Sequence, residues 1–279
     1  MRYINYLKSK DKIYDLYNNL EIILILGFMD LKLKYRNSKL GFLWSFLKPL
    51  LQFIVYFIVF VILFKVNDGE SYPLRLFFGV IIWSFFSEGT SLGLNSYVGK
   101  ASIIKKINVN KVLLPIAAYI TPALNFVLNF MMFLLIYFVF ILTGNDPLPL
   151  NGFGIKNVII AICMFIDLGI IIISINIILA NLNAIFRDLK DIWDLILQYG
   201  VFMTPILYSL PVPEQYRVAY FGLNILAYPI EMLKLQFFEY KTLTIDYYVL
   251  LVHVIGIIFL CSLAIFVHKK INKKVADFL

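Results

Sequence analysis

The chain has 279 residues, of which 61% are hydrophobic and 15% are charged, and its formal net charge is +8. Ordinary soluble domains are about half apolar and about a quarter charged, so this composition, with several runs of about 20 apolar residues, excludes a soluble globular protein. The basic residues cluster in short segments between the apolar runs. There they act as topology signals and lipid-headgroup contacts, which argues against a nucleic-acid partner.

A basic, amphipathic stretch precedes the first apolar run. The first 20 residues are polar and lack the apolar core of a cleavable signal peptide, so we expect the first span to direct membrane insertion. From Asp30 to Leu40 basic residues alternate with apolar ones, and the stretch continues without a linker into the first span. This arrangement is typical of a membrane permease whose basic part lies on the cytosolic face.

The apolar runs predict an all-α fold with six transmembrane helices. At a rise of about 1.5 Å per residue, each run is long enough to cross a hydrocarbon core of about 30 Å, and the fifth is the shortest. The predicted spans are 41–64, 76–98, 114–142, 157–182, 192–209 and 247–268.

The distribution of Lys and Arg predicts that both termini are cytosolic. With this orientation, the cytosolic segments hold eight basic residues in 1–40, four in 99–111, two in 183–191 and four after 268. The result is 18 basic residues inside and six in the outer loops, and such an excess marks the cytosolic side.

The connection at 99–111 mixes basic and apolar side chains. Its central residues are Ile103, Ile104, Lys105, Lys106 and Ile107. One interpretation is a solvated turn that binds lipid headgroups. The other is a short helix that docks into a groove on a cytosolic partner, with the isoleucines as anchors.

Residues 210–246 are too apolar for a plain external loop and too interrupted by proline and charge for a span. Pro211, Pro213 and Pro229 break the segment, which also contains Glu231 and Lys234. We expect a re-entrant pair of short helices, because irregular backbone at membrane depth is tolerated where protein or a water-filled cavity surrounds it. An interfacial amphipathic helix is the alternative.

Three ionisable residues lie inside predicted spans and are candidates for function. Lys48 and Glu88 lie at similar depth on consecutive antiparallel helices, so we expect them to pair or to share a wet cavity. Asp167, near the middle of the fourth span, is an alternative partner for Lys48. The competing interpretation is a structural ion pair without a role in transport.

The residues give no sign of catalysis or cofactor binding. His253 and His268 have no second ligand at helical spacing, and Cys163 and Cys261 fall inside spans as apolar core residues. The nearest approach to a phosphate loop ends at Ala101, which lacks the hydroxyl that holds magnesium. We therefore expect no metal site, no cofactor and no ATPase site in this chain.

Three stretches resemble ABC-2 type permeases that export lipid-linked polysaccharide. Residues Asp30–Leu50 resemble the beginning of the first span in the O-antigen, capsule and teichoic-acid exporters. Asn183–Asp191, which includes Arg187 and Asp188, resembles the loop between their fourth and fifth spans, and Met203–Tyr208 resembles the end of the fifth. The resemblance covers nearly the whole chain.

Two departures from the family pattern accompany the resemblance. Asn224-Ile225-Leu226 stands where the family often has Asn-Pro-Leu, so the re-entrant turn is expected to differ. Residues 108–110, Asn-Val-Asn, stand where the family often has proline in the coupling segment, which defines the start of the third span less sharply.

The resemblance implies a homodimeric permease that works with two separate ATP-binding cassette subunits. It implies an N-terminal interfacial helix at 12–35, a coupling helix at 99–111 and re-entrant extracellular helices at 210–246. The substrate implied is a lipid-linked glycan, moved from the cytosol across a bacterial or archaeal plasma membrane. The alternatives are an ABC-2 permease for a small amphiphile or drug, and a partner-independent channel or scaffold.

Overall fold

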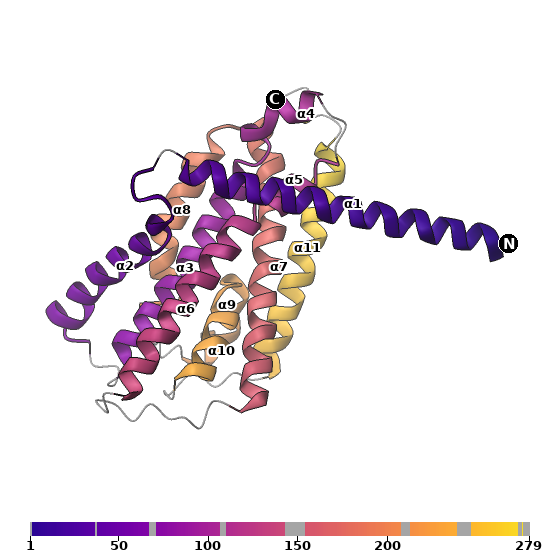
Figure 1. The fold of residues 1–279 in the computed structure, drawn as a ribbon. Helices are drawn as coiled ribbons and strands as arrows, with labels where there is room; N and C mark the ends of the chain where they lie inside the picture. Colours follow the sequence, from indigo (N-terminus) through magenta and orange to yellow (C-terminus); the bar gives the residue numbers. More distant parts are fainter. Residues whose placement is uncertain are drawn as a thin grey trace.

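The computed structural model describes residues 2–36, 38–66, 71–106, 110–142, 154–207, 213–238, 247–272 and 275, with side chains from residue 18 onward except at 103, 140 and 214. Within these ranges the chain forms helices and no strand, which confirms the all-α fold (Figure 1). The helices are α1 (Arg2–Tyr35), η1 (Gly41–Leu43), α2 (Trp44–Tyr56), η2 (Phe57–Leu63), α3 (Tyr72–Leu94), η3 (Val98–Lys100), α4 (Ala101–Lys106), α5 (Leu113–Ala117), α6 (Ile120–Leu142), α7 (Ile155–Ile185), α8 (Leu189–Met203), α9 (Glu214–Leu223), α10 (Ala227–Phe237) and α11 (Tyr247–Ile271).

In the described part of the chain, five helical segments are long and apolar enough to cross a membrane. They are Gly41–Leu63, Tyr72–Leu94, Leu113–Val139, Ile155–Ile185 and Tyr247–Ile271. The fifth predicted span, 192–209, coincides with α8, which has 15 residues. That length corresponds to about 22 Å, shorter than a hydrocarbon core of about 30 Å, so the count of six is not confirmed.

Helix α8 ends where a proline follows. Thr204, its C-terminal cap, has extended backbone angles, and Pro205 comes next. A residue before proline is disfavoured in the helical region, so the helix stops at Met203. The predicted span continued past this point because its apolar residues continue.

Helix α3 is the centre of the bundle, and α2 is its most exposed span. The most apolar stretch of α3 is 72% buried inside the chain, whereas that of the 41–63 span is 6% buried. Aromatic rings fill the space around α3, with Phe78 against Phe133 at 5.0 Å between ring centroids and Phe85 against Phe126 at 4.7 Å. Figure 1 shows α2 running outward from the bundle that surrounds α3.

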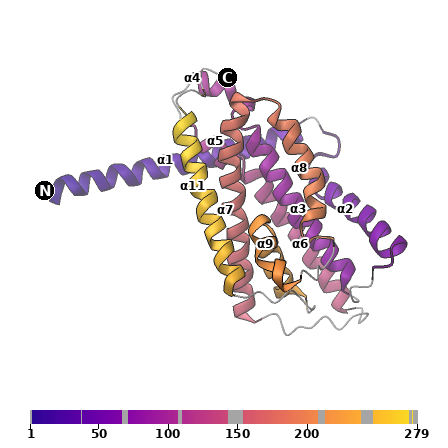
Figure 2. The ribbon, with the colours of Figure 1, turned by 180° about the vertical axis from the view of Figure 1, so that it is seen from behind.

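Helix α1 lies across one end of the bundle, together with α4 and α5 (Figures 1 and 2). We call this the α1 end. Thr121 donates a hydrogen bond to the carbonyl of Gly27 over 3.3 Å, and Lys100 pairs with Asp30 at 2.5 Å. These contacts attach the second half of α1 to the bundle, while the position of 12–35 in a membrane interface stays a prediction.

A turn at Gly41 redirects the chain from α1 into α2. Gly41 has a φ of +50°, a left-handed conformation that glycine adopts without steric cost. Its amide donates to the side-chain oxygen of Ser38 over 3.1 Å, which fixes the turn. The first span therefore leaves the bundle at an angle to α1.

Two short helices, α9 and α10, occupy part of the segment 210–246 and lie toward the opposite end of the bundle (Figure 2). The end of α8 holds them in place. Asn224, between the two helices, donates to the carbonyl of Met203 over 3.1 Å, and Lys234 donates to the carbonyl of Pro205. The expected pair of short helices is thus present in the described residues, and its re-entry into a membrane stays a prediction.

The crossing of α3 and α7 depends on glycine. A Cβ atom at Gly93 would lie 2.0 Å from Cγ of Asn176, and one at Gly89 would lie 2.9 Å from Cγ2 of Ile172. Asn176 is fully buried, and with its amide nitrogen turned toward α3 it donates to the carbonyls of Gly89 and Ile172 at 3.1 Å each. Small residues four apart permit such close packing of membrane helices.

We predict that Gly93→Ala destabilises the bundle by about 1–3 kcal/mol, because the added methyl group overlaps Asn176. Gly99→Ala is the matched control, since a Cβ there meets nothing within 4 Å. The measurement is the denaturation midpoint of the purified chain in detergent. Equal midpoints for the two variants would contradict the packing argument.

Candidate functional site

A polar cavity of about 380 Å³ lies among α1, α2, α3 and α6, near the α1 end. Aromatic rings of Tyr35, Trp44, Phe85 and Phe126 form part of its wall. Its polar lining consists of Lys34, Ser45, Lys48, Gln52, Ser84, Ser87, Glu88, Ser91, Asn125 and Asn129. Such a concentration of charge and hydroxyl groups inside apolar spans marks this cavity as the candidate site.

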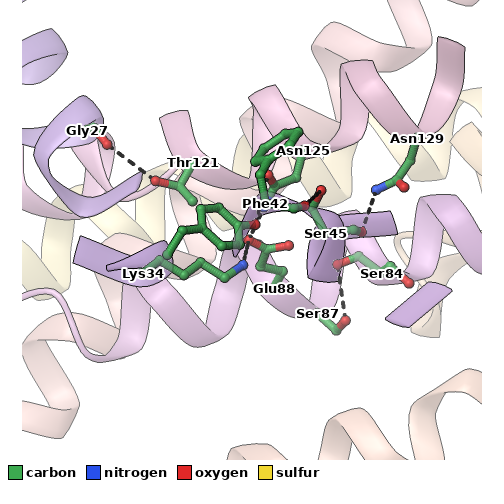
Figure 3. Close-up of polar contacts among 11 residues, drawn as sticks. Gly27, Lys34, Phe42, Ser45, Ser84, Ser87, Glu88, Thr121, Asn125 and Asn129 are labelled. Carbon is green, nitrogen blue, oxygen red and sulfur yellow. Dashed lines mark hydrogen bonds and ion pairs between the residues drawn. The ribbon is translucent and has the colours of Figure 1, made fainter. Parts of the chain in front are cut away.

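Glu88 is the centre of a hydrogen-bond network that joins three helices (Figure 3). Lys34, near the end of α1, pairs with its Oε1 at 2.5 Å, and Asn125 of α6 donates to the same oxygen over 2.7 Å. Tyr35 donates to Oδ1 of Asn125 over 3.2 Å. The carboxylate on α3 therefore has two donors, one of them charged.

Lys48 lines this cavity together with Glu88, which is one of the two arrangements predicted for them. The other predicted arrangement, a direct ion pair between Lys48 and Glu88, is wrong. Glu88 pairs with Lys34 instead. The physical reason is that α1 lies across the end of the bundle against α5 and α6, so that the side chain of Lys34 reaches Glu88, which depth along the spans does not reveal. Within the described ranges Lys48 has neither a hydrogen bond nor an ion pair, and its side chain is exposed to the cavity.

The alternative pairing of Lys48 with Asp167 is also wrong. Nε2 of His253 on α11 donates to Oδ2 of Asp167 on α7 over 2.9 Å. The His253 ring stacks on Tyr228 of α10, with centroids 4.4 Å apart and planes 25° from parallel. These three residues join α7, α10 and α11, and only the positions of Asp167 and His253 inside predicted spans could have indicated them from the sequence.

A second buried ion pair was not predicted from the sequence. Glu231 and Lys234 lie one turn apart on α10, with 3.2 Å between Oε1 and Nζ, and each side chain is 3% exposed. Lys234 also donates to the carbonyl of Pro205. In the sequence these charges indicate only an interrupted span, whereas the structure uses them to hold α10 against the end of α8.

The predicted coupling segment contains α4. Lys105 and Lys106 are exposed, and Ile104 is half-buried against a cluster formed by Tyr97, Leu114, Ala180, Ala184 and Val275. Ile103 lies in α4, and Ile107 lies outside the described residues. Ile104 therefore contacts the core of its own chain, and the exposed surface of α4 is basic. Burial raises the pKa of the Tyr97 hydroxyl well above its usual value, because the surroundings disfavour the charged phenolate.

Arg187 and Asp188 form the exposed turn between α7 and α8. The backbone carbonyl of Asp188 accepts a bond from the amide of Ile192 over 3.2 Å, which starts α8. Asn183, just before this turn, donates to the carbonyl of Leu94 over 3.0 Å and attaches it to the end of α3. The side chains of Arg187 and Asp188 lie outside the core, and their role in a cytosolic loop stays a prediction.

The long apolar helices and the polar cavity among them define this chain as an all-α, multi-pass membrane protein. No protein-family model matches the chain.

Three known proteins are similar to the chain over most of its length, each named "O-antigen export system permease protein RfbA". One, from Myxococcus xanthus, is 27% identical over 229 residues, covering 81% of this chain and 84% of the relative. Two from Klebsiella pneumoniae are 27% and 28% identical over 204 residues, each covering 73% of this chain and 75% of the relative. These similarities confirm the resemblance to ABC-2 permeases of polysaccharide export.

We predict that His253→Phe lowers the free energy of unfolding by about 1–3 kcal/mol. The new ring keeps the stack on Tyr228, but Asp167 is left buried without its donor. Adding Asp167→Leu should recover much of this loss, because apolar residues often replace a buried polar pair at little cost.

The measurement is denaturation of the purified chain in mixed micelles. His268→Phe serves as the control, since the ring of His268 has only a 3.5 Å contact with Asn181. If the effects of Asp167→Leu and His253→Phe on the free energy of unfolding simply add in the double variant, the pair does not contribute to stability as described.

Proposed function

We propose that the chain is the transmembrane permease subunit of an ATP-driven exporter that moves lipid-linked polysaccharide from the cytosolic side across the plasma membrane. The observation that carries the proposal is the similarity to three O-antigen export permeases over 73% to 81% of the chain. The polar cavity and the membrane-spanning helices support it, because a permease needs both a bilayer scaffold and a hydrophilic region within it.

In this proposal the energy comes from two separate ATP-binding cassette subunits, and the α1 end of the bundle faces the cytosol. The excess of basic residues in the segments at this end supports the orientation. The exposed Lys105 and Lys106 of α4, with the turn at Arg187 and Asp188, would form the surface that contacts the ATPases. ATP-driven closure of the ATPases would then move α4 and, through Ile104, the core that it contacts.

We also propose that two copies of the chain form the permease, with α8 near their interface. Asp191, Asp194 and Gln198 are exposed on this helix. Exposed acids and amides facing lipid tails are costly, so a second copy or a water-filled path has to cover them. The 41–63 span, little buried within its own chain, supplies further apolar surface for such a contact.

The functional test is co-purification of the chain with a candidate ATPase, followed by ATP hydrolysis with and without a lipid-linked glycan. We expect the glycan lipid to stimulate hydrolysis and the mass of the complex to correspond to two copies of each subunit. Stimulation by small amphiphiles but by no glycan lipid would favour the alternative permease, and failure to bind any ATPase would favour a channel or scaffold.

The variant Lys105→Glu/Lys106→Glu should reduce the glycan-stimulated hydrolysis by about tenfold or more, because charge reversal at a docking surface opposes association. Lys269→Glu/Lys270→Glu, at the exposed end of α11, is the matched control. Equal activity of both variants would show that α4 is not the coupling surface.

A further inference from the structure

We propose that a pocket between α6, α7 and α10 holds one acyl chain of a bilayer phospholipid, with the phosphate group of that lipid at Lys156. The pocket shares no lining residue with the polar cavity at the α1 end. Its ligand is a lipid of the surrounding membrane and not a transported molecule, so the site goes beyond the proposed function and does not depend on it.

The lining of the pocket suits hydrocarbon. The pocket has a volume of about 240 Å³, and Asn157 and Gln236 are its polar lining residues. Three aromatic rings meet there, with the ring centroid of Phe130 5.4 Å from that of Phe165 and 5.6 Å from that of Phe237. The other lining residues are Leu134, Val158, Ala161 and Ile162. A water molecule needs two to four polar partners in a cavity, so an apolar lining favours an apolar occupant.

The pocket opens toward the surface that a bilayer surrounds. Val158 and Ile162 belong to its lining and are 47% and 52% exposed. Leu135 and Ile159, the sequence neighbours of two lining residues, are exposed as well. All four lie in the apolar spans Leu113–Val139 and Ile155–Ile185, whose exposed side chains contact lipid tails. An acyl chain that enters gains dispersion contacts with the ring walls that an empty pocket would forfeit.

The depth of the pocket matches the acyl chains of one leaflet. Helix α6 starts at the α1 end, where Thr121 contacts Gly27, so its later residues and the start of α7 lie toward the opposite end (Figures 1 and 2). Along α7 the lining runs from Asn157 to Phe165, about 12 Å at a rise of about 1.5 Å per residue. Half of a hydrocarbon core is about 15 Å thick. A chain in the pocket therefore stays within one leaflet.

Lys156 places a positive charge at the headgroup end of the pocket. It is exposed in the first turn of α7, one residue before Asn157 of the lining. A lysine near the end of a span extends toward the membrane interface, where it attracts anionic headgroups. The two parts of a phospholipid thus match two adjoining features of α7, because its phosphate can meet the lysine while its acyl chain enters the pocket.

The test is photolabelling of the purified full chain in phosphatidylcholine nanodiscs that contain a trace of a lipid with a diazirine in its acyl chain. The probes are phosphatidylglycerol and uncharged diacylglycerol, and mass spectrometry locates the label. We expect pocket-lining peptides of α6 and α7 to carry about fivefold more phosphatidylglycerol label than α11 around Ile258 and Phe259, which are exposed to exchanging lipid. Equal labelling of the two regions would overturn the proposal. The comparison uses the unaltered chain, so it is independent of any folding defect.

A pair of variants on α7 locates the acyl chain. Val158→Trp fills the mouth of the pocket and should reduce labelling at Phe130 and Phe165 about fivefold. Ile159→Trp is the matched control, since Ile159 is an exposed neighbour outside the lining and its replacement should leave the labelling unchanged. Unchanged labelling in Val158→Trp, or an equal loss in both variants, would contradict the assignment.

The two probes test the phosphate contact. The unaltered chain should prefer phosphatidylglycerol to diacylglycerol about fivefold, the effect of one lysine near anionic headgroups. Lys156→Met should abolish this preference and Lys156→Arg should retain it. Lys269→Met, at an exposed lysine near the α1 end, is the control that should leave it intact. Diacylglycerol labelling as strong as that of phosphatidylglycerol in the unaltered chain would overturn the phospholipid assignment.

Discussion

The arrangement of the α1 end depends on the carboxylate of Glu88, which lies in the C-terminal half of α3, the most buried span. A carboxylate there requires a donor, and it has two, Lys34 and Asn125. Because Lys34 belongs to α1 and Asn125 to α6, the carboxylate attaches both helices to α3. The left-handed turn at Gly41 then directs α2 away from the bundle. The same arrangement leaves Lys48 facing the cavity without an ion pair among the described residues, so one structural ion pair shapes both the cavity and its charge.

Buried polar groups hold the opposite half of the bundle in a similar way. Asp167 and His253 join α7 to α11, and Glu231 and Lys234 hold α10 against the end of α8. In each case a charge that would be costly in the bilayer has its partner inside the chain.

The sequence predicted the helices better than their contacts. The last span was expected at 247–268 and is Tyr247–Ile271, because its apolar run has clear ends. The end of the fifth span was placed too far along the chain because hydropathy does not register the effect of Pro205 on Thr204. The common cavity of Lys48 and Glu88 followed from their depth, but the partner of Glu88 did not, since it depends on how α1 lies across α5 and α6 and so places Lys34. The motif at Met203 now has a physical basis, as its backbone carbonyls accept bonds from Asn224 and Lys234.

The most direct test of this account is a pair of double-mutant cycles on the free energy of unfolding in mixed micelles. One cycle crosses Glu88→Gln with Lys34→Met, and the other crosses Glu88→Gln with Lys48→Met. The account predicts a coupling energy of about 1 kcal/mol for the first pair, as measured for partly exposed ion pairs, and one near zero for the second. Coupling of Glu88 to Lys48 and none to Lys34 would contradict it.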